Sequence, residues 1–256
     1  MVSLYSLLDL RNALLKPGCP ICQIRKKSVR RYIDVLVYER INDVEPRIRY
    51  REGMGYCPEH TRLVAAIGQK TEEKPREMNI LYESLAKGVK EIISKYPIPR
   101  HRPNHLQRMI LRLFPGRFSM NSPKDLTSKF TCRICQIADE SDLLGLETLM
   151  QCLQDPKEQV YMLYLKSVGI CLPHLRTALQ IFSDMYPSGA LILKEFAVNR
   201  LQHWEQAMGE YIRKQGLQER HEKVLPEEET AWLQAVAFFT GDNPGNMSSK
   251  LLKRQV

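Results

Sequence analysis

The tetrapeptide Cys19-Pro20-Ile21-Cys22 is followed, after 34 intervening residues, by Cys57-Pro58-Glu59-His60. The arrangement occurs a second time, where Cys132-Arg133-Ile134-Cys135 is followed after 35 residues by Cys171-Leu172-Pro173-His174. Six of the seven cysteines and two of the six histidines fall into these motifs. A Cys-x2-Cys knuckle places two sulfurs on one ion, and Cys-x2-His at a helix start supplies a third sulfur and an imidazole. The spacing therefore predicts two tetrahedral metal sites.

Proximity in the sequence suggests how the eight ligands are shared between these sites. The first site is predicted to use Cys19, Cys22, Cys57 and His60, and the second Cys132, Cys135, Cys171 and His174. Three thiolates and one imidazole suit Zn²⁺, so we expect two zinc ions per chain. Four protein ligands leave no open coordination position, and this is typical of structural zinc rather than catalytic zinc.

Two other uses of a Cys-x2-Cys pair are less consistent with the sequence. Redox pairs of the Cys-Pro-x-Cys type belong on the strand-to-helix turn of a βαβ unit, whereas here a predicted helix and Pro17-Gly18 precede the pair. Haem attachment needs a histidine directly after the second cysteine, and Gln23 and Gln136 occupy these positions.

Apolar residues recur at helical spacing along most of the chain, and no sustained alternating pattern predicts a strand. Helices are expected over about 3–15, from Cys22 to about Asn42, over 71–96, and from Pro187 onward. Two short helices are expected to begin at Pro46 and Pro156, because proline suits the first helical position. A last helix is expected to begin at Pro226. The fold class is therefore predicted to be all-α.

The two motif pairs stand at an offset of 113 or 114 residues, which indicates an internal duplication. We accordingly predict two similar zinc-stapled helical units plus a C-terminal helix. The expected domains are 1–99 (first zinc-binding unit), 100–131 (basic amphipathic linker), 132–241 (second zinc-binding unit with the C-terminal helix) and 242–256 (disordered tail).

Positive charge is concentrated between the two predicted units. The chain has a formal net charge of +9, and residues 100–133 hold eight Arg or Lys and one acidic residue. A basic block of this kind indicates either a solvated linker or a contact surface for an acidic partner or an anionic membrane. Arg102, Arg108, Arg112 and Arg117 are the candidate partner-binding residues. We expect an unknown macromolecular partner, a protein or a nucleic acid, and peripheral membrane contact stays open as an alternative.

Composition and segment lengths restrict the class of protein further. A chain of 256 residues with 43% hydrophobic and 26% charged residues can bury a sizeable core. Seven cysteines leave one thiol unpaired in any scheme made only of disulfides, so a reducing, cytoplasmic location is expected. No apolar run approaches the roughly 20 residues of a membrane-spanning helix.

The motifs resemble those of an uncharacterised bacterial family of unknown function. The resemblance rests on Cys19-Pro20-Ile21-Cys22, on Gly55-Tyr56-Cys57-Pro58-Glu59-His60, and on the recurrence of the pattern in the second half, where Arg133 and Ile170 replace the proline and the aromatic residue. It implies a metal-binding helical protein, and it implies no activity.

No acid, base or nucleophile constellation stands out beside the predicted closed sites. We therefore expect a non-enzymatic zinc-binding scaffold or regulatory protein. The alternative is a thiol-based redox switch in which oxidation expels the zinc.

Overall fold

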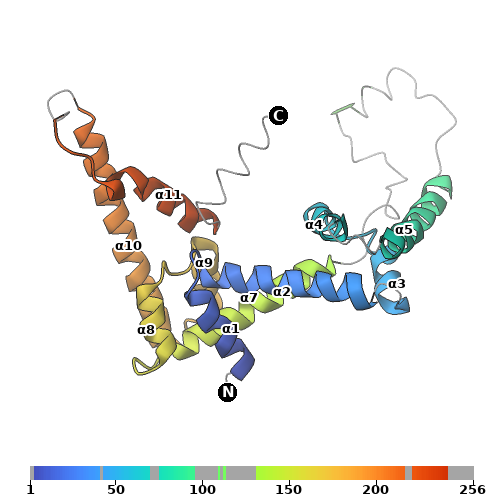
Figure 1. The fold of residues 1–256 in the computed structure, drawn as a ribbon, viewed down its shortest axis with the longest axis horizontal. Coiled ribbons are helices and arrows are strands. Elements are labelled where there is room, and N and C mark those ends of the chain that lie inside the picture. Colours follow the sequence, from blue (N-terminus) through green and yellow to red (C-terminus); the bar gives the residue numbers. More distant parts are fainter. Residues whose placement is uncertain are drawn as a thin grey trace. The chain divides into compact units, whose positions relative to one another are not determined.

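The computed structural model of the chain describes residues 3–40, 43–69, 75–95, 109, 112–113, 131–216 and 221–241 (Figure 1). The prediction of an all-α fold is confirmed, since these residues contain helices and no strand. In chain order the helices are α1 (Leu4–Leu14), α2 (Pro20–Val35), the π-helix η1 (Leu36–Arg40), α3 (Val44–Glu52), α4 (Pro58–Gln69), α5 (Pro75–Lys95), α7 (Arg133–Cys152), α8 (Gln159–Lys166), α9 (Leu172–Phe182), α10 (Pro187–Lys214) and α11 (Pro226–Thr240).

The chain divides into two compact units that do not follow the halves of the sequence. Unit 1 consists of residues 1–29 and 138–256, and unit 2 consists of residues 30–137. Helix α2 begins in unit 1 and ends in unit 2, whereas α7 begins in unit 2 and ends in unit 1. Both unit boundaries lie inside long helices, at 29/30 in α2 and at 137/138 in α7, whereas the sequence predicted domains of 1–99 and 132–241.

Unit 1 is built around one apolar core. In it α10 packs against α9 and α11, α9 packs against α11, and α1 packs against α8. Two helices come close at Gly189 on α10, where an added Cβ would lie 2.5 Å from the carbonyl oxygen of Met150 on α7. Only glycine allows this spacing, so α10 can lie directly on the end of α7.

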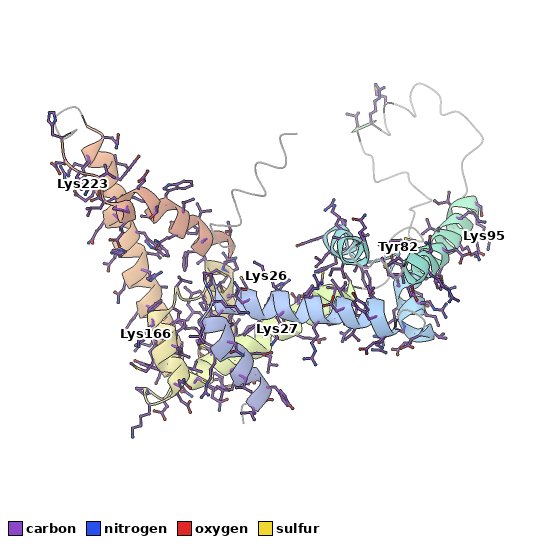
Figure 2. The ribbon with its side chains drawn as sticks, in the orientation of Figure 1. Lys26, Lys27, Tyr82, Lys95, Lys166 and Lys223 are labelled. Carbon is purple, nitrogen blue, oxygen red and sulfur yellow. The ribbon has the colours of Figure 1, made fainter. Side chains whose placement is uncertain are left out.

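Within unit 1, the first turns of α2 run antiparallel to the second half of α7. Ile21 and Ile24 contact Gly145, and one turn further along α2 the guanidinium of Arg25 reaches Asp142 and Asp139. Lys26 and Lys27, the next two residues of α2, are exposed (Figure 2). The ammonium group of Lys27 donates a hydrogen bond to the carboxylate of Asp9 on α1 at 2.5 Å.

Unit 2 has fewer described buried apolar side chains than unit 1, and one of its clusters is rich in aromatic residues. Helices α3 and α4 both pack on α5. Tyr50 of α3 and Leu81 of α5 are buried, and the ring of Tyr50 lies 4.9 Å from that of Tyr56 and 6.0 Å from that of Tyr82 (centroid distances). On α5, the apolar side chains that belong to this cluster recur at helical spacing, and they are Met78, Leu81, Tyr82 and Leu85.

Two predicted helix starts are displaced in the structure. Asp155-Pro156 lies in a turn before α8, where the Asp155 carboxylate accepts a hydrogen bond from the Lys157 N–H, and α8 itself begins at Gln159. Helix α3 begins at Val44, two residues before Pro46. The start of α11 at Pro226 is confirmed, and there the Glu228 side chain accepts a hydrogen bond from the Leu225 N–H.

Among the helices that the structure describes, none combines the length and the apolar character needed to cross a membrane.

Candidate metal centres

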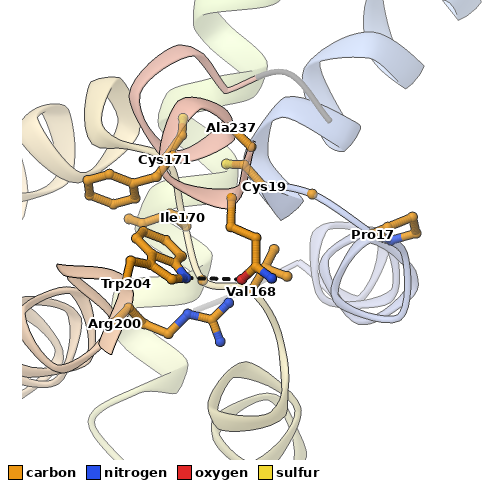
Figure 3. A pocket seen from close by; sticks show the side chains of 12 residues that line it. Pro17, Cys19, Val168, Ile170, Cys171, Arg200, Trp204 and Ala237 are labelled. Carbon is orange, nitrogen blue, oxygen red and sulfur yellow. Dashed lines mark hydrogen bonds between the residues drawn. The ribbon is translucent and has the colours of Figure 1, made fainter. Parts of the chain in front are cut away.

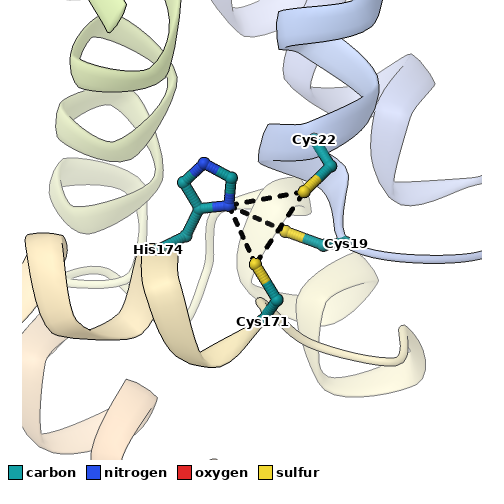
Figure 4. A group of neighbouring side chains, drawn as sticks. All are labelled: Cys19, Cys22, Cys171 and His174. Carbon is teal, nitrogen blue, oxygen red and sulfur yellow. Dashed lines mark hydrogen bonds between the residues drawn. The ribbon is translucent and has the colours of Figure 1, made fainter. Parts of the chain in front are cut away.

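Unit 1 contains a cluster of four ligand side chains, Cys19, Cys22, Cys171 and His174, called here the first cluster (Figure 4). The Nδ1 atom of His174 lies 3.0 Å from the sulfur of Cys171 and 3.5 Å from those of Cys19 and Cys22. The sulfurs of Cys22 and Cys171 are 3.8 Å apart. All four ligand atoms fall within 4.8 Å of one another.

These distances are close to those of a tetrahedral metal site. Zinc–sulfur bonds of about 2.3 Å and zinc–nitrogen bonds of about 2.0 Å, at tetrahedral angles, separate two sulfurs by about 3.8 Å and a sulfur from a nitrogen by about 3.5 Å. The first cluster could thus hold one metal ion with little movement of its side chains.

The same local device positions the ligands in all four motifs. The first ligand of each motif, at positions 19, 57, 132 and 171, is the residue directly before a helix, and the second lies three residues later in its first turn. The carbonyl of each first ligand accepts the opening helical hydrogen bond, for example from the Leu175 N–H to Cys171. The exposed N–H groups and the positive dipole end of the helix favour thiolate at these positions.

Glycine two residues ahead of each Cys-x2-His motif sets the direction of the chain. Gly55 and Gly169 have φ of +90° and +74°, in the left-handed region that other residues adopt only with strain. At Gly169 an added Cβ would also lie 2.7 Å from the ring of Phe196.

A carboxylate orients the imidazole of the first cluster. The Nε2 atom of His174, on the far side of the ring from the sulfurs, lies 3.3 Å from Asp142 Oδ2, and that carboxylate also accepts from Arg25. Burial disfavours the charge on Arg25, but Asp142 and Asp139 outweigh it and raise the pKa of the guanidinium. Such outer partners fix the tautomer and the ring orientation of a ligating histidine.

Without metal, the groups of the first cluster share their protons. Burial lowers the pKa of His174, but hydrogen bonds to Asp142 and the thiols outweigh it and raise that pKa to about 12. Burial raises the pKa of Cys19, but hydrogen bonds with the neighbouring ligands outweigh burial, so the pKa of Cys19 is lowered overall. In contrast, hydrogen bonding to Cys171 and Cys19 raises the pKa of Cys22. Metal binding therefore displaces protons from the cluster.

Unit 2 contains the second cluster, formed by Cys57, His60, Cys132 and Cys135. Nδ1 of His60 lies 3.2, 3.6 and 3.3 Å from the sulfurs of Cys57, Cys132 and Cys135, and the sulfurs of Cys57 and Cys135 are 3.7 Å apart. These distances fit the same tetrahedron. Here only His60 is buried, and the three cysteines are half-buried. Burial and the neighbouring thiols raise the pKa of Cys135 to about 12.

The predicted sharing of ligands between the sites is wrong, although the structure gathers the same eight residues. Each cluster joins the Cys-x2-Cys of one half of the sequence to the Cys-x2-His of the other half. Helix length is the physical reason. At 1.5 Å per residue, α2 is about 24 Å long and leads the chain away from Cys22, whereas α3 is only about 14 Å long and cannot return the chain to it. In the second half, α7 is about 30 Å long and α8 about 12 Å, so the same mismatch separates Cys135 from Cys171.

Of the candidate partner-binding residues, Arg102, Arg108 and Arg117 lie outside the described residues, as does most of the segment 100–131. Arg112 is described and exposed. The predicted tail, 242–256, also lies outside the described residues. Sequence reasoning missed the role of Asp142, for which the position of an acidic residue seven places after Cys135 was the only signal.

The fold and the two clusters define this chain as an all-helical protein with two four-residue Cys/His groups that could hold metal ions. Residues 8–215 match the model of a family of unknown function, DUF6062, and the chain belongs to this family. The resemblance to an uncharacterised family is thereby confirmed.

One curated relative gives a shorter match. An uncharacterized 23.9 kDa protein in the xynA 3' region of Caldicellulosiruptor sp. (strain Rt8B.4) is 34% identical over 50 residues, which cover 20% of this chain and 24% of that protein. The match thus spans about a quarter of the relative's length. No solved structure matches the chain.

Proposed function

We propose that the chain is a non-enzymatic zinc-binding scaffold in which each of two Zn²⁺ ions joins a Cys-x2-Cys motif to a Cys-x2-His motif from the other half of the sequence. The observation that carries the proposal is the tetrahedral spacing of the ligand atoms in both clusters. Soft sulfur and imidazole ligands in this geometry select zinc, and four protein ligands leave no position for a substrate. The role of the metal is then structural, since it stabilises the fold.

The order of helices supports the proposal of an internal duplication. In each half, a helix that starts with Cys-x2-Cys is followed by a short helix, a helix that starts with Cys-x2-His, and a long helix: α2, α3, α4 and α5, then α7, α8, α9 and α10. Crossed pairing of the ligands ties the two copies together, so that neither copy could hold a metal ion by itself.

Metal analysis of the purified chain tests the proposal. Native mass spectrometry should find two zinc ions in the folded chain, one in each of the variants Cys57→Ser and Cys171→Ser, and two in Cys152→Ala. Cys152 is a matched control because it is a buried cysteine of the unit 1 core outside both clusters. A folded wild-type chain without metal would contradict the proposal.

The scaffold is proposed to act through a macromolecular partner that binds the basic segment 100–133. The support is the charge of this segment together with the exposed side chain of Arg112. Replacing Arg102, Arg108, Arg112 and Arg117 by Ser should abolish partner capture in a pull-down at low salt and leave the zinc content at two. Nuclease treatment of the lysate separates a nucleic-acid partner, whose binding also weakens steeply with salt, from a protein partner.

A thiol redox switch is the second candidate function, and the half-buried cysteines of the second cluster favour it. A zinc-bound thiolate exposed to solvent can be oxidised by peroxide, after which two sulfurs form a disulfide and the zinc leaves. Low peroxide should then release one zinc ion reversibly and pair two of Cys57, Cys132 and Cys135 before the first cluster reacts. If the thiols stay reduced and both zinc ions stay bound at low peroxide, the redox switch is contradicted and the scaffold function remains.

A further inference from the structure

Beside the first cluster, unit 1 contains a cavity of about 260 Å³ (Figure 3). Its walls come from the segment before α2, the segment 168–171, and helices α10 and α11. Ile170, Trp204 and Phe238 make much of the wall apolar. Pockets for drug-sized ligands usually measure roughly 300–1,000 Å³, so this cavity suits a smaller molecule.

One cation in this apolar wall has no partner of opposite charge. The guanidinium carbon of Arg200 lies 5.3 Å from the ring centroid of Trp204 and 5.8 Å from that of Phe196. Its Nε atom is buried without a hydrogen-bond partner, and no described carboxylate pairs with it. Burial lowers the pKa of Arg200, because the charge is partly removed from water without an anion beside it.

Other arginines of unit 1 show what is missing at Arg200. Arg213, between three and four turns further along α10, bonds Glu210 at 2.8 Å and Glu222 at 2.6 Å, and Arg25 bonds Asp142. Arg200 is half-buried, so its charge is partly removed from water without an anion beside it, and the contacts with the rings offset only part of that cost.

The thiolates of the first cluster do not serve as the anionic partner of Arg200. Cys19 and Cys171 also line the cavity, but neither sulfur accepts a hydrogen bond from Arg200 in the part of the chain that the structure describes. Asp142 and Arg25 already form the charged surroundings of that cluster. Arg200 therefore has donors directed at a space that a ligand can enter.

We propose that this cavity binds a small organic monocarboxylate with an aromatic or branched aliphatic body. The carboxylate pairs with the guanidinium fork of Arg200, the match for which arginine is suited, and the body lies against Trp204 and Phe238. A second donor is present, since Gln234 accepts from the Trp204 indole N–H at 3.0 Å through Oε1 and keeps its amide N–H groups for a ligand. This inference goes beyond the scaffold function and does not depend on a macromolecular partner.

Tryptophan fluorescence of the zinc-loaded full chain tests the proposal. The chain has two tryptophans, and Trp232 is 55% exposed on α11, so the variant Trp232→Phe leaves Trp204 as the only reporter. Phenylacetate and 3-methylbutanoate are the probes, and phenylacetamide is the uncharged match for phenylacetate. We expect a saturable fluorescence change with at least one carboxylate. The affinity for phenylacetamide should be lower by about tenfold or more, because the amide lacks the charged hydrogen-bonded pair with Arg200.

Variants then assign the effect to Arg200. In the Trp232→Phe background, Arg200→Gln should weaken carboxylate binding by about tenfold or more, and Arg200→Lys by less, because the charge stays and the fork is lost. Arg213→Gln, on the same helix, should bind as before, and all variants should keep two zinc ions. No saturable change with either carboxylate, equal binding of phenylacetamide, or unchanged affinity in Arg200→Gln would each overturn the proposal. Loss of zinc from Arg200→Gln at unchanged carboxylate affinity would overturn it as well, and would assign the charge to the first cluster.

Discussion

The two Cys/His clusters have the same ligands at similar distances, but the protein around them differs. Three ligands of the first cluster are buried, and His174 is held by Asp142, whereas in the second cluster only His60 is buried. Of the described residues, unit 1 contributes 27 buried apolar side chains and unit 2 contributes eight. We therefore expect bound metal to add to an existing core in unit 1, and we expect unit 2 to depend on its metal for most of its stability.

Loss of one metal ligand should reveal the largest difference in stability between the two units. Structural zinc contributes about 10–16 kcal/mol in small modules, as much as the whole stability of a typical domain. Cys57→Ser should therefore unfold unit 2, so that amide hydrogens of α3, α4 and α5 exchange rapidly while those of α9 and α10 stay protected. Cys171→Ser should lower the melting temperature of unit 1, while its larger core keeps most helices formed. Hydrogen-exchange mass spectrometry measures both.

Cys152→Ala is the control for these variants, because it removes a buried thiol and no ligand. Its amide hydrogens should exchange in the same pattern as those of the wild type, and its overall stability should be only slightly lower. Faster exchange in α9 and α10 of Cys57→Ser, with α3 to α5 unchanged, would contradict the assignment of one cluster to each unit.

A smaller effect is expected from the carboxylate behind His174. Asp142→Asn weakens the hydrogen bond that orients the ring, and loss of such a partner typically lowers metal affinity by about 10- to 100-fold. Asp139→Asn is the matched control, since Asp139 lies on the same helix, is 66% exposed and pairs with Arg25 without being bonded to His174. Chelator competition should show weaker binding of one zinc ion in Asp142→Asn alone. Equal weakening in both variants would assign the effect to Arg25 instead.

The smallest effect should come from Gly241, at the end of α11. An added Cβ would lie 2.9 Å from the sulfur of Cys22 and 3.2 Å from that of Cys171, at a φ of +78°. Gly241→Ala should cost about 1–2 kcal/mol of backbone strain and loosen the first cluster alone. Gly209→Ala, with open space around it, should not lower the melting temperature. Thermal unfolding with zinc release as a second signal compares them, and a loss from the second cluster in Gly241→Ala would be inconsistent with the structure.

The helical fold and the eight candidate ligands could be predicted from the sequence, because both follow from local patterns. Apolar stripes at helical spacing mark α5 and α10, and Cys-x2-Cys with Cys-x2-His marks ligands that are neighbours in one helical turn. The start of α11 at Pro226 is local in the same sense.

The grouping of the ligands could not be read from spacing, because it depends on where long helices carry the chain. The lengths of α2 and α3 contained the signal, since the shorter helix cannot return the chain to Cys22. The bond between Asp142 and His174 joins residues 32 positions apart, and the cavity at Arg200 is lined by several separate segments of the chain, so no short motif marks either feature.

Crossed pairing of the motifs is the central claim, and NMR of the chain loaded with ¹¹³Cd tests it most directly. Each cadmium ion couples through its thiolate bonds to the β-protons of its own cysteines. The structure predicts one resonance coupled to Cys19, Cys22 and Cys171, and a second coupled to Cys57, Cys132 and Cys135. Coupling of one resonance to Cys19, Cys22 and Cys57 would contradict the crossed pairing and restore sites made within each half of the sequence.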